Sequence, residues 1–471
     1  MQTSHSGRAA ALFTSCFRWD KPFARQVLAI TLPIILQNMI ASSLQIVDGL
    51  MVSGLGDINY AAVVQTNRYT FLFQLFVFGV ASGGAIFMSQ FWGAGDVRRM
   101  RQSMGVSLLW TGVVMIVFIT GASLFPAQII NLFLPQGESA AIAKVYLRWV
   151  LPSYLFHGIN MVYATCLKSG EKPHIPLVSG SIGLGLNTLL NYGLIYGHFG
   201  LPAMGVKGAA LATCIAAGTT MVLTLLFAYG KHLPAGARLN EMFHWDKAFH
   251  AHFAKTTTPV VFNEGLWALG TTMYGIYYGH MGDTAVAAMG VVSTVDNLVW
   301  IFIFGMMHST AIIVGKAIGT GEPDNAYLYA KRMIALSMAS GVVLGVILGF
   351  IRLPMLSLFS GLSAAAIQTA ATVLLIESFT MWFRAFNAIN VVGVLRAGGD
   401  TVFSLKLDVG SMWLIGVPLC AAATFLLHWP VEIIYVCTLA EEVVKMFIGL
   451  PHFKSRVWIQ NLTTIEGEPA R

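Results

Sequence analysis

Residues 27–50 read VLAITLPIILQNMIASSLQIVDGL, and Asp48 is the only charged side chain in this stretch. A helix rises about 1.5 Å per residue, so the stretch is long enough to cross the roughly 30 Å hydrocarbon core of a bilayer. Similar stretches recur along nearly the whole chain. We predict twelve membrane-spanning helices, at residues 27–50, 61–90, 104–124, 142–166, 175–197, 205–229, 257–279, 286–316, 332–352, 369–395, 404–427 and 430–450.

The composition agrees with a membrane protein. Hydrophobic residues make up 56% of the chain and charged residues only 10%, whereas soluble domains carry about 25% charged residues. The 28 Lys and Arg exceed the 21 Asp and Glu, but in a membrane protein such an excess reflects orientation, and we expect no nucleic-acid partner. The expected fold class is an all-α polytopic membrane protein, with the lipid bilayer as its partner.

Basic residues occur on alternate loops. The loops at residues 51–60, 125–140, 198–204, 280–285, 353–368 and 428–429 contain neither Lys nor Arg, whereas the N-terminal segment and the intervening loops are basic. By the positive-inside rule, both termini are expected in the cytoplasm, as an even number of spans requires. No apolar segment with a small-residue cleavage site precedes the first span, so we expect no removable signal peptide.

The second half of the chain repeats the first. LPIILQN at 32–38 aligns with TPVVFNE at 258–264, which relates Pro33 to Pro259 by an offset of 226 in the numbering. The same offset matches a further series: Gly49 with Gly275, Gly56-Asp57 with Gly282-Asp283, Ala61-Ala62 with Ala287-Ala288, Phe78-Gly79 with Phe304-Gly305, Gly93 with Gly319 and Gly95 with Gly321. Farther along, Leu167-Lys168 aligns with Leu395-Arg396 at an offset of 228. Each half holds six spans, an even number, so the repeat is parallel and predicts two pseudo-symmetric six-helix lobes, as in secondary transporters.

These features define the expected organisation: a cytoplasmic N-terminal segment (1–26), an N-lobe (27–229), a cytoplasmic linker (230–256), a C-lobe (257–452) and a cytoplasmic tail (453–471). The linker is polar and contains several His; we interpret it as a solvated loop, with a histidine metal site as the alternative. Pro33 and Pro259 should each bend a helix because proline removes a backbone hydrogen bond. Gly341, Gly345 and Gly349 recur at every fourth position and should mark a close helix contact.

Asp48 is the first candidate functional residue, because an ionisable side chain inside a span costs about 2.5–3.5 kcal/mol on insertion scales. Asn187 and Asn191 are one helical turn apart and therefore share one helix face. A carboxylate with two amide oxygens suits Na⁺ or a shared proton, so we predict a cation-coupling cluster of Asp48, Asn187 and Asn191. The alternative is a structural hydrogen bond between helices.

Glu264 is the second intramembrane acid. Arg384, in the tenth span, is its expected counter-ion, and Glu377 competes for the same arginine because it lies two turns earlier on the same face. If Arg384 neutralises Glu264 permanently, the pair is structural; otherwise Glu264 is a second coupling residue.

Arg68 and Asp296 occupy near-equivalent positions of the repeat, at an offset of 228. They suggest an outer gate in which the two side chains pair across the lobes. The alternative is that each pairs within its own lobe.

Aromatic residues are frequent in the spans. A cavity lined by Phe71, Tyr274, Tyr277 and Trp300, with Asn387 nearby, would bind organic cations through apolar and cation–π contacts. Core or lipid-facing packing explains any single one of them better.

Several motifs resemble the multidrug and toxic compound extrusion (MATE) family. They are Pro33 followed by Asp48 and GLG at 54–56, QFWGAGD at 90–96, GLNTLLNYGLIYG at 185–197, GVKGAA at 205–210 and LRAGGDT at 395–401. The resemblance covers about residues 25–450. The LRAGGDT run and WIQNLT at 458–463 are similar to a bacterial branch.

The resemblance implies two lobes that rock in alternating access and export cationic or amphipathic compounds in exchange for H⁺ or Na⁺. Asp48 and Asn187 fall on the family's helix 1 acid and helix 5 Asn. Asn191 stands where DinF-type members often have Asp, whereas Glu264 matches the helix 7 acid of NorM-type members. The helix 10 acid of the NorM type is missing, with Asn387 near its place, so the chain mixes features of both branches.

We therefore expect a monomeric antiporter for small organic cations in a bacterial inner (plasma) membrane. No cofactor is expected beyond H⁺ or Na⁺, for which Asp48 is the candidate Na⁺ ligand. We find no Walker, HExxH or GxSxG motif, and expect no enzyme. The alternative is a flippase for lipids or lipid-linked oligosaccharides; such proteins often have a more basic cavity, whereas only Arg68 and Arg384 lie clearly within the predicted spans.

Overall fold

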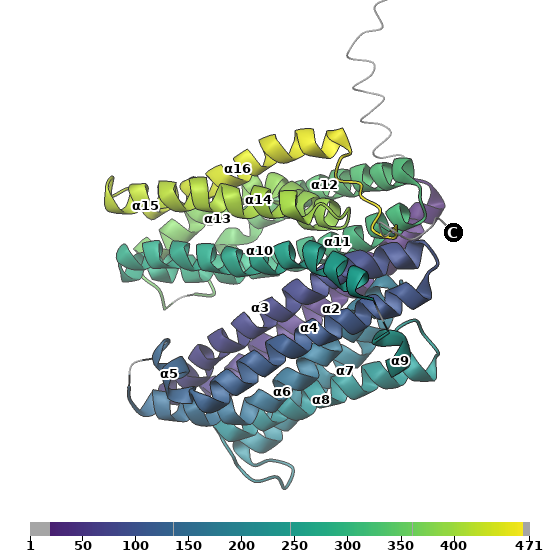
Figure 1. Cartoon of the computed structure of the whole chain (residues 1–471). Helices are drawn as coiled ribbons and strands as arrows, with labels where there is room; N and C mark the ends of the chain where they lie inside the picture. Colours follow the sequence, from purple (N-terminus) through teal and green to yellow (C-terminus); the bar gives the residue numbers. More distant parts are fainter. Residues whose placement is uncertain (1–18, 135, 245, 360, 465–471) are drawn as a thin grey trace, which may run out of the picture. The chain divides into compact units, whose positions relative to one another are not determined.

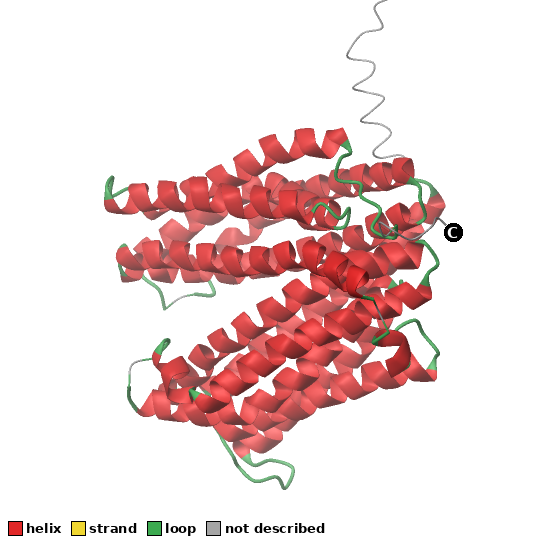
Figure 2. Cartoon of the chain, in the orientation of Figure 1, coloured by secondary structure: helices red, strands yellow, loops and turns green. Residues whose placement is uncertain are grey.

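The computed structural model describes residues 19–464 except 135, 245 and 360, and this part of the chain is helical without a β-strand (Figures 1 and 2). The first eighteen residues of the predicted N-terminal segment and residues 465–471 of the predicted tail lie outside the described residues.

Twelve long helical segments run through the described residues, as predicted. Those of the first half are α2 (Lys21–Ser53), α3 (Asp57–Gly93), α4 (Val97–Leu124), α6 (Glu138–Ser169), α7 (His174–Tyr196) and α8 (Val206–Gly230). Those of the second half are α10 (Lys247–His280), α11 (Asp283–Gly319), α12 (Pro323–Leu356), α13 (Ala364–Ala388) with the π-helical η1 (Ile389–Arg396), α14 (Thr401–Ser411) with η2 (Met412–Gly416) and α15 (Val417–Phe425), and α16 (Val431–Ser455). Short helices α5 (Pro126–Asn131) and α9 (Leu239–Met242) lie between them.

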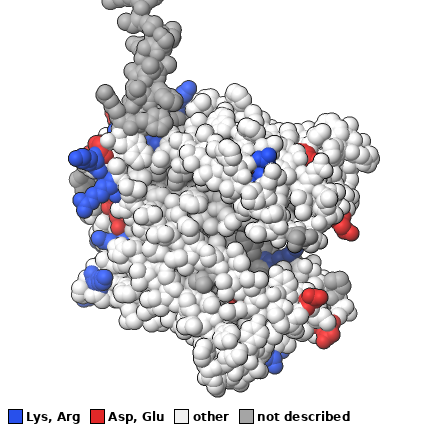
Figure 3. Space-filling view, turned by 180° about the vertical axis from the view of Figure 1, so that it is seen from behind, with Lys and Arg blue, Asp and Glu red and all other residues white. Residues whose placement is uncertain are grey.

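Eight of these segments are apolar enough to cross a membrane by length and hydropathy alone. The other four are α6, α7, α10 and α16, and α10 and α16 carry buried ionisable side chains that lower their hydropathy. Figure 3 shows that most of the face it presents is uncharged. Large apolar side chains such as Leu124 and Phe350 are exposed on the helices, which suits contact with lipid chains.

Glycine–aspartate turns begin equivalent helices in the two halves. Gly56 and Gly282 have φ values of +92° and +97°, a region that L side chains rarely adopt. Each is followed by an aspartate at the start of the next helix, α3 or α11, where a negative charge is favourable. The repeated sequence thus forms a repeated turn.

The chain divides into two compact units. The N-unit comprises Leu32–Val261, and the C-unit comprises the residues up to Thr31 together with those from Phe262 onward. These units differ from the predicted lobes because their boundaries fall inside α2 and α10, close to Pro33 and Pro259. The linker residues 230–256 belong to the N-unit, where Glu241 of α9 pairs with Arg101 of α4 at 3.1 Å.

The core of the N-unit is aromatic where α3 and α6 meet. The rings of Phe73 and Tyr154 stack with centroids 4.3 Å apart, and the Tyr69 hydroxyl donates to the carbonyl of Phe118 in α4 at 2.8 Å. These contacts join α3, α4 and α6, and α8 packs against α6.

In the C-unit, the glycine series on α12 lies against α13. A Cβ at Gly345 would overlap the carbonyl oxygen of Ser378, whereas one at Gly349 would lie 3.5 Å from the Ser378 hydroxyl, an ordinary contact. The predicted close contact is therefore present at Gly345.

We predict that Gly345→Ala destabilises the C-unit by about 1–3 kcal/mol, because the added methyl forces α12 and α13 apart. Gly349→Ala is the matched control, since it makes the same helical substitution in ordinary space. Thermal unfolding in detergent measures both variants, and equal melting temperatures for the two would contradict the prediction.

Candidate functional site

The predicted cluster in the N-unit joins α2 and α7. Asn191 donates from Nδ2 to Asp48 Oδ1 and, at 3.3 Å, to Asn187 Oδ1. Asn187 in turn donates to the Thr213 hydroxyl of α8 at 3.4 Å. The structure thus brings together the three residues predicted to form the coupling cluster; their role in coupling is still a prediction.

Two features make this cluster fit a cation. No Lys or Arg nitrogen forms an ion pair with Asp48 among the described residues. Asn191 is fully buried and its Oδ1 has no hydrogen-bond partner in the described part of the chain. A carboxylate oxygen and an unpartnered amide oxygen are hard ligands that can bind Na⁺ or a proton. Burial increases the free-energy cost of leaving these oxygens without a partner.

The pairing predicted for Glu264 is wrong. Its partner is Arg396 at the end of η1, with Nη1 2.6 Å from Glu264 Oε1, and both side chains are almost completely buried. Arg384 is not its counter-ion, because the guanidinium of Arg384 pairs with Glu377 and Asp296 instead. Glu264 is therefore a neutralised acid in this structure.

Arg384 instead binds two acids of the C-unit. It pairs with Glu377 at 2.7 Å, as the competing interpretation held, and with Asp296 of α11 at 3.3 Å. Its guanidinium also lies over the Trp300 ring, 5.3 Å from the centroid. Asp296 thus pairs within its own unit, as the alternative to the outer gate held. Arg68 lies exposed on α3, and a gate between Arg68 and Asp296 stays a prediction that requires Asp296 to leave Arg384.

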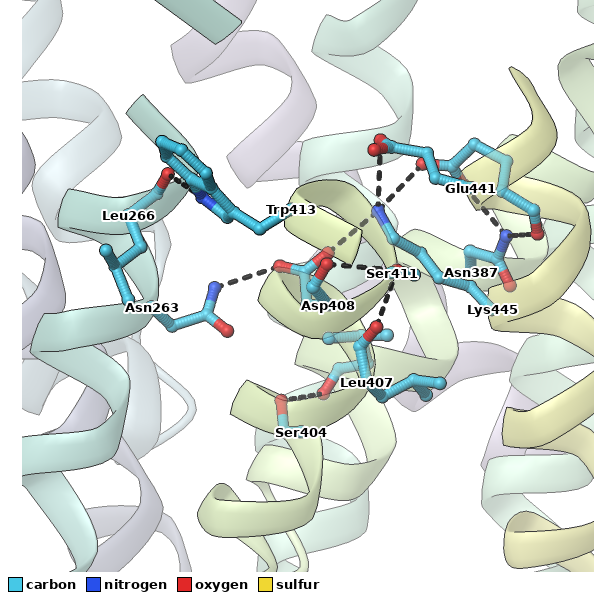
Figure 4. A network of polar contacts seen from close by, with 12 residues as sticks. Asn263, Leu266, Asn387, Ser404, Leu407, Asp408, Ser411, Trp413, Glu441 and Lys445 are labelled. Atoms are coloured by element: carbon cyan, nitrogen blue, oxygen red, sulfur yellow. Dashed lines mark hydrogen bonds and ion pairs between the residues drawn. The ribbon is translucent and has the colours of Figure 1, made fainter. Parts of the chain in front are cut away.

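A third polar cluster, the Lys445 network, lies within the C-unit (Figure 4). The Lys445 ammonium of α16 is 2.9 Å from Asp408 Oδ1 of α14, 3.0 Å from Glu442 Oε1 and 3.4 Å from Glu441 Oε1. Lysine has three N–H donors, so each one meets a different carboxylate.

Neutral donors hold the other oxygen of each carboxylate. Asn263 of α10 donates to Asp408 Oδ2 at 2.9 Å, Tyr274 donates to Glu441 Oε2 at 2.7 Å, and Asn387 of α13 donates to Glu442 Oε2 at 2.8 Å. All six carboxylate oxygens therefore have a donor. The network connects four helices, α10, α13, α14 and α16. Residues of the C-unit itself therefore provide the partners of all three acids.

The sequence analysis missed this network, although its signal was present. The four charged residues of the network lie inside the predicted spans 404–427 and 430–450: Asp408, Glu441, Glu442 and Lys445. The spacing of Glu441 and Glu442 to Lys445 is i,i+4 and i,i+3, which puts them on one helix face. The prediction that only Arg68 and Arg384 are basic residues within the spans is therefore wrong, because Lys445 is buried in α16.

The predicted cavity residues have different environments. Phe71 is exposed, Trp300 packs under Arg384, and Tyr274 and Asn387 belong to the Lys445 network. Tyr277 is buried in the core of the C-unit. Their role as a substrate cavity is still a prediction.

One open pocket of about 450 Å³ lies in the N-unit, away from all predicted site residues. Apolar side chains of α6 and α8 line most of it, including Phe156, Ile215 and Leu223. Among the described residues no group of three or more His, Cys, Asp or Glu is arranged to hold a metal ion, which includes the described part of the histidine-containing linker.

A repeat of six spans, with ionisable side chains inside spans of both units, defines the class as secondary membrane transporters. A family model described as MatE matches residues 33–193 and 259–422. The uncharacterized transporter YisQ of Bacillus subtilis is 25% identical over 94% of this chain and 96% of its own length. A probable multidrug resistance protein NorM of Bradyrhizobium diazoefficiens is 25% identical over 85% of this chain and 86% of its own length.

Solved structures share the fold. A variant of the Vibrio cholerae MATE transporter VcmN superposes with a TM-score of 0.85 at 17% identity, covering 95% of this chain and 99% of that one. The chain belongs to the MatE family of multidrug efflux transporters, whose members are transporters and not enzymes. The family that the motifs resembled is thereby confirmed.

Proposed function

We propose that this protein is a secondary active antiporter that exports small organic cations in exchange for H⁺ or Na⁺, with Asp48 as the residue that binds the coupling ion. The observation that carries the proposal is the Asp48–Asn191 pair: an acid inside a span, held by an amide, without a basic partner among the described residues. The acid clusters of the C-unit differ, because Arg396, Arg384 and Lys445 neutralise them.

Charge provides the coupling. An ionised Asp48 without a counter-ion is costly in the hydrocarbon layer. A bound ion removes this cost, so the protein with the ion and the protein without it favour different conformations. An ion that binds one conformation better shifts the population toward it, and the organic cation binds in the other half of the cycle. Asn187 and Asn191 orient the carboxylate and offer amide oxygens to the ion.

The basic loops support a bacterial inner-membrane location with both termini in the cytoplasm. The names of the relatives, which include multidrug resistance proteins, support efflux over lipid flipping. A monomer is sufficient for the proposed cycle, because both halves lie in one chain.

The test is transport by purified protein in proteoliposomes. A cationic dye should move against its gradient when either an inward Na⁺ gradient or an inward proton gradient is imposed, and the effective gradient identifies the coupling ion. Dye flux that responds to neither gradient would contradict antiport.

A further inference from the structure

The helices that carry the candidate acids begin in the opposite unit. Residues of α2 up to Thr31 belong to the C-unit, whereas Asp48, farther along the same helix, lies in the N-unit. In the same way, α10 belongs to the N-unit up to Val261, whereas Glu264 lies in the C-unit. Each of the two helices therefore connects the units covalently.

The start of α2 is fixed in the C-unit by what we call the α2 anchor: Asp20, Phe23 and Arg332. Asp20 Oδ1 accepts the Phe23 N–H at 2.9 Å, and Asp20 Oδ2 is 3.3 Å from Arg332 of α12. The Arg332 guanidinium lies over the Phe23 ring at 5.0 Å, and this ring stacks on Tyr329 at 4.9 Å. The Phe23 amide, and then Arg332, hold the pKa of Asp20 below its ordinary value, so the aspartate stays charged.

The start of α10 is fixed in the N-unit by the α10 anchor: Asp246, Phe249 and Arg99. Asp246 Oδ1 accepts the Phe249 N–H at 2.6 Å, and Asp246 Oδ2 is 3.9 Å from Arg99 of α4. The Arg99 guanidinium lies over the Phe249 ring at 5.2 Å, and that ring packs edge-on against Phe87. The two anchors thus have the same three parts in the same arrangement.

The repeat relates the anchors. Asp20 and Phe23 align with Asp246 and Phe249 at an offset of 226, which also relates Pro33 to Pro259. The two arginines are related by an offset of 233 instead, so they occupy different positions of the repeat and still cover the equivalent ring. Both halves therefore keep the same contact although different helix positions supply the arginine.

A proline follows each anchor close to the unit boundary. Pro33 and Pro259 have no N–H to donate to the carbonyls one turn earlier, those of Ala29 and Lys255, so the helix is weakest there. Both helices therefore have the same order of features: an anchored first segment, then a proline that removes a backbone hydrogen bond, and then an ionisable side chain.

We propose that the two anchors are positioning devices of the transport cycle: α2 transmits the ion occupancy of Asp48 in the N-unit to the C-unit, and α10 links the C-unit back to the N-unit. This inference rests on the proposed antiport. Without the anchors, the ion still binds Asp48, but the first segment of α2 moves independently and the units no longer respond together.

The test measures the distance between the units by pulsed electron spin resonance. Spin labels are attached through Leu132→Cys in the N-unit and Leu358→Cys in the C-unit, both highly exposed, with the native cysteines replaced by alanine. The coupling ion is titrated as Na⁺ and, separately, as H⁺. The same proteins are assayed in proteoliposomes for dye transport and for ion leak without dye.

The anchor variant is Asp20→Asn with Asp246→Asn. Asn caps a helix about as well as Asp, so the helix starts are kept while both ion pairs are lost. A second variant, Phe23→Leu with Phe249→Leu, keeps apolar burial and removes the rings. Asp324→Asn is the matched control, because Asp324 pairs with Arg456 at 2.6 Å and that arginine lies over Tyr327 at 4.2 Å, on helices that do not cross between units.

We expect the wild type and the control to change distance with the ion, and both anchor variants to lose at least about half of the population shift. We also expect the variants to leak ions while their ion affinity is unchanged, which a merely structural contact would not produce. If the distance between the labels in the anchor variants changes with the ion as it does in the wild type, the inference is overturned and the proposed antiport stays intact. A wild type that responds to neither ion would overturn the antiport and the inference together.

Discussion

Asp48→Asn should abolish ion-coupled efflux, with dye transport falling to the level of empty vesicles. Asn has the same shape and can still bond to Asn191, but it carries no charge for an ion to neutralise. Residue 48 then stays neutral throughout the cycle and no longer binds the coupling ion, so the ion gradient cannot drive transport. The measurement is gradient-driven transport of a cationic dye in proteoliposomes at matched protein content.

The control for this prediction is Asp57→Asn, the same substitution at the exposed start of α3. It should transport like the wild type. Normal gradient-driven efflux by the Asp48 variant, in protein that melts at the wild-type temperature, would remove Asp48 from the mechanism.

Lys445→Met has the largest expected effect on stability. The side chain is buried and its ammonium is shared by Asp408, Glu441 and Glu442. Methionine fills a similar volume but leaves three carboxylates without their cation, and breaking a buried ion pair costs about 3–5 kcal/mol. The melting temperature in detergent should fall clearly below that of the wild type.

Removing charge from the acids should restore part of this loss. We expect the triple variant, which combines Lys445→Met with Asp408→Asn and Glu442→Gln, to have a higher melting temperature than Lys445→Met alone. Arg456→Met is the surface control, because its ion pair with Asp324 is exposed and such pairs contribute about 0–1 kcal/mol. Equal melting temperatures for Lys445→Met and Arg456→Met would contradict a structural role for the network.

Much of the architecture was predictable from sequence because hydrophobic length and the register of the repeat are local properties of the chain. The contact between Asp48 and Asn191 was also predictable, since a charge in a span needs a polar partner and the two asparagines share a face. Both predictions needed only spacing and the cost of burying charge.

The pairings inside the C-unit were not predictable in the same way. Arg396 directly follows the predicted end of a span, in a loop expected at the cytoplasmic surface, whereas the structure buries it beside Glu264. The unit boundaries within α2 and α10 depend on which unit Phe23 and Phe249 pack against. This packing is a tertiary contact, and the hydrophobicity of the sequence does not specify it.

The hydroxyl bond from Tyr274 to Glu441 marks a chemical difference between the two halves of the repeat. Tyr274 aligns with Asp48 at the offset of 226, so it stands at the same place in the second copy. One copy thus carries an acid and the other a phenol that steadies a neighbouring acid. In the proposed cycle, the two copies of the repeat therefore have different tasks, with charge exchange in the first copy and rigidity in the second.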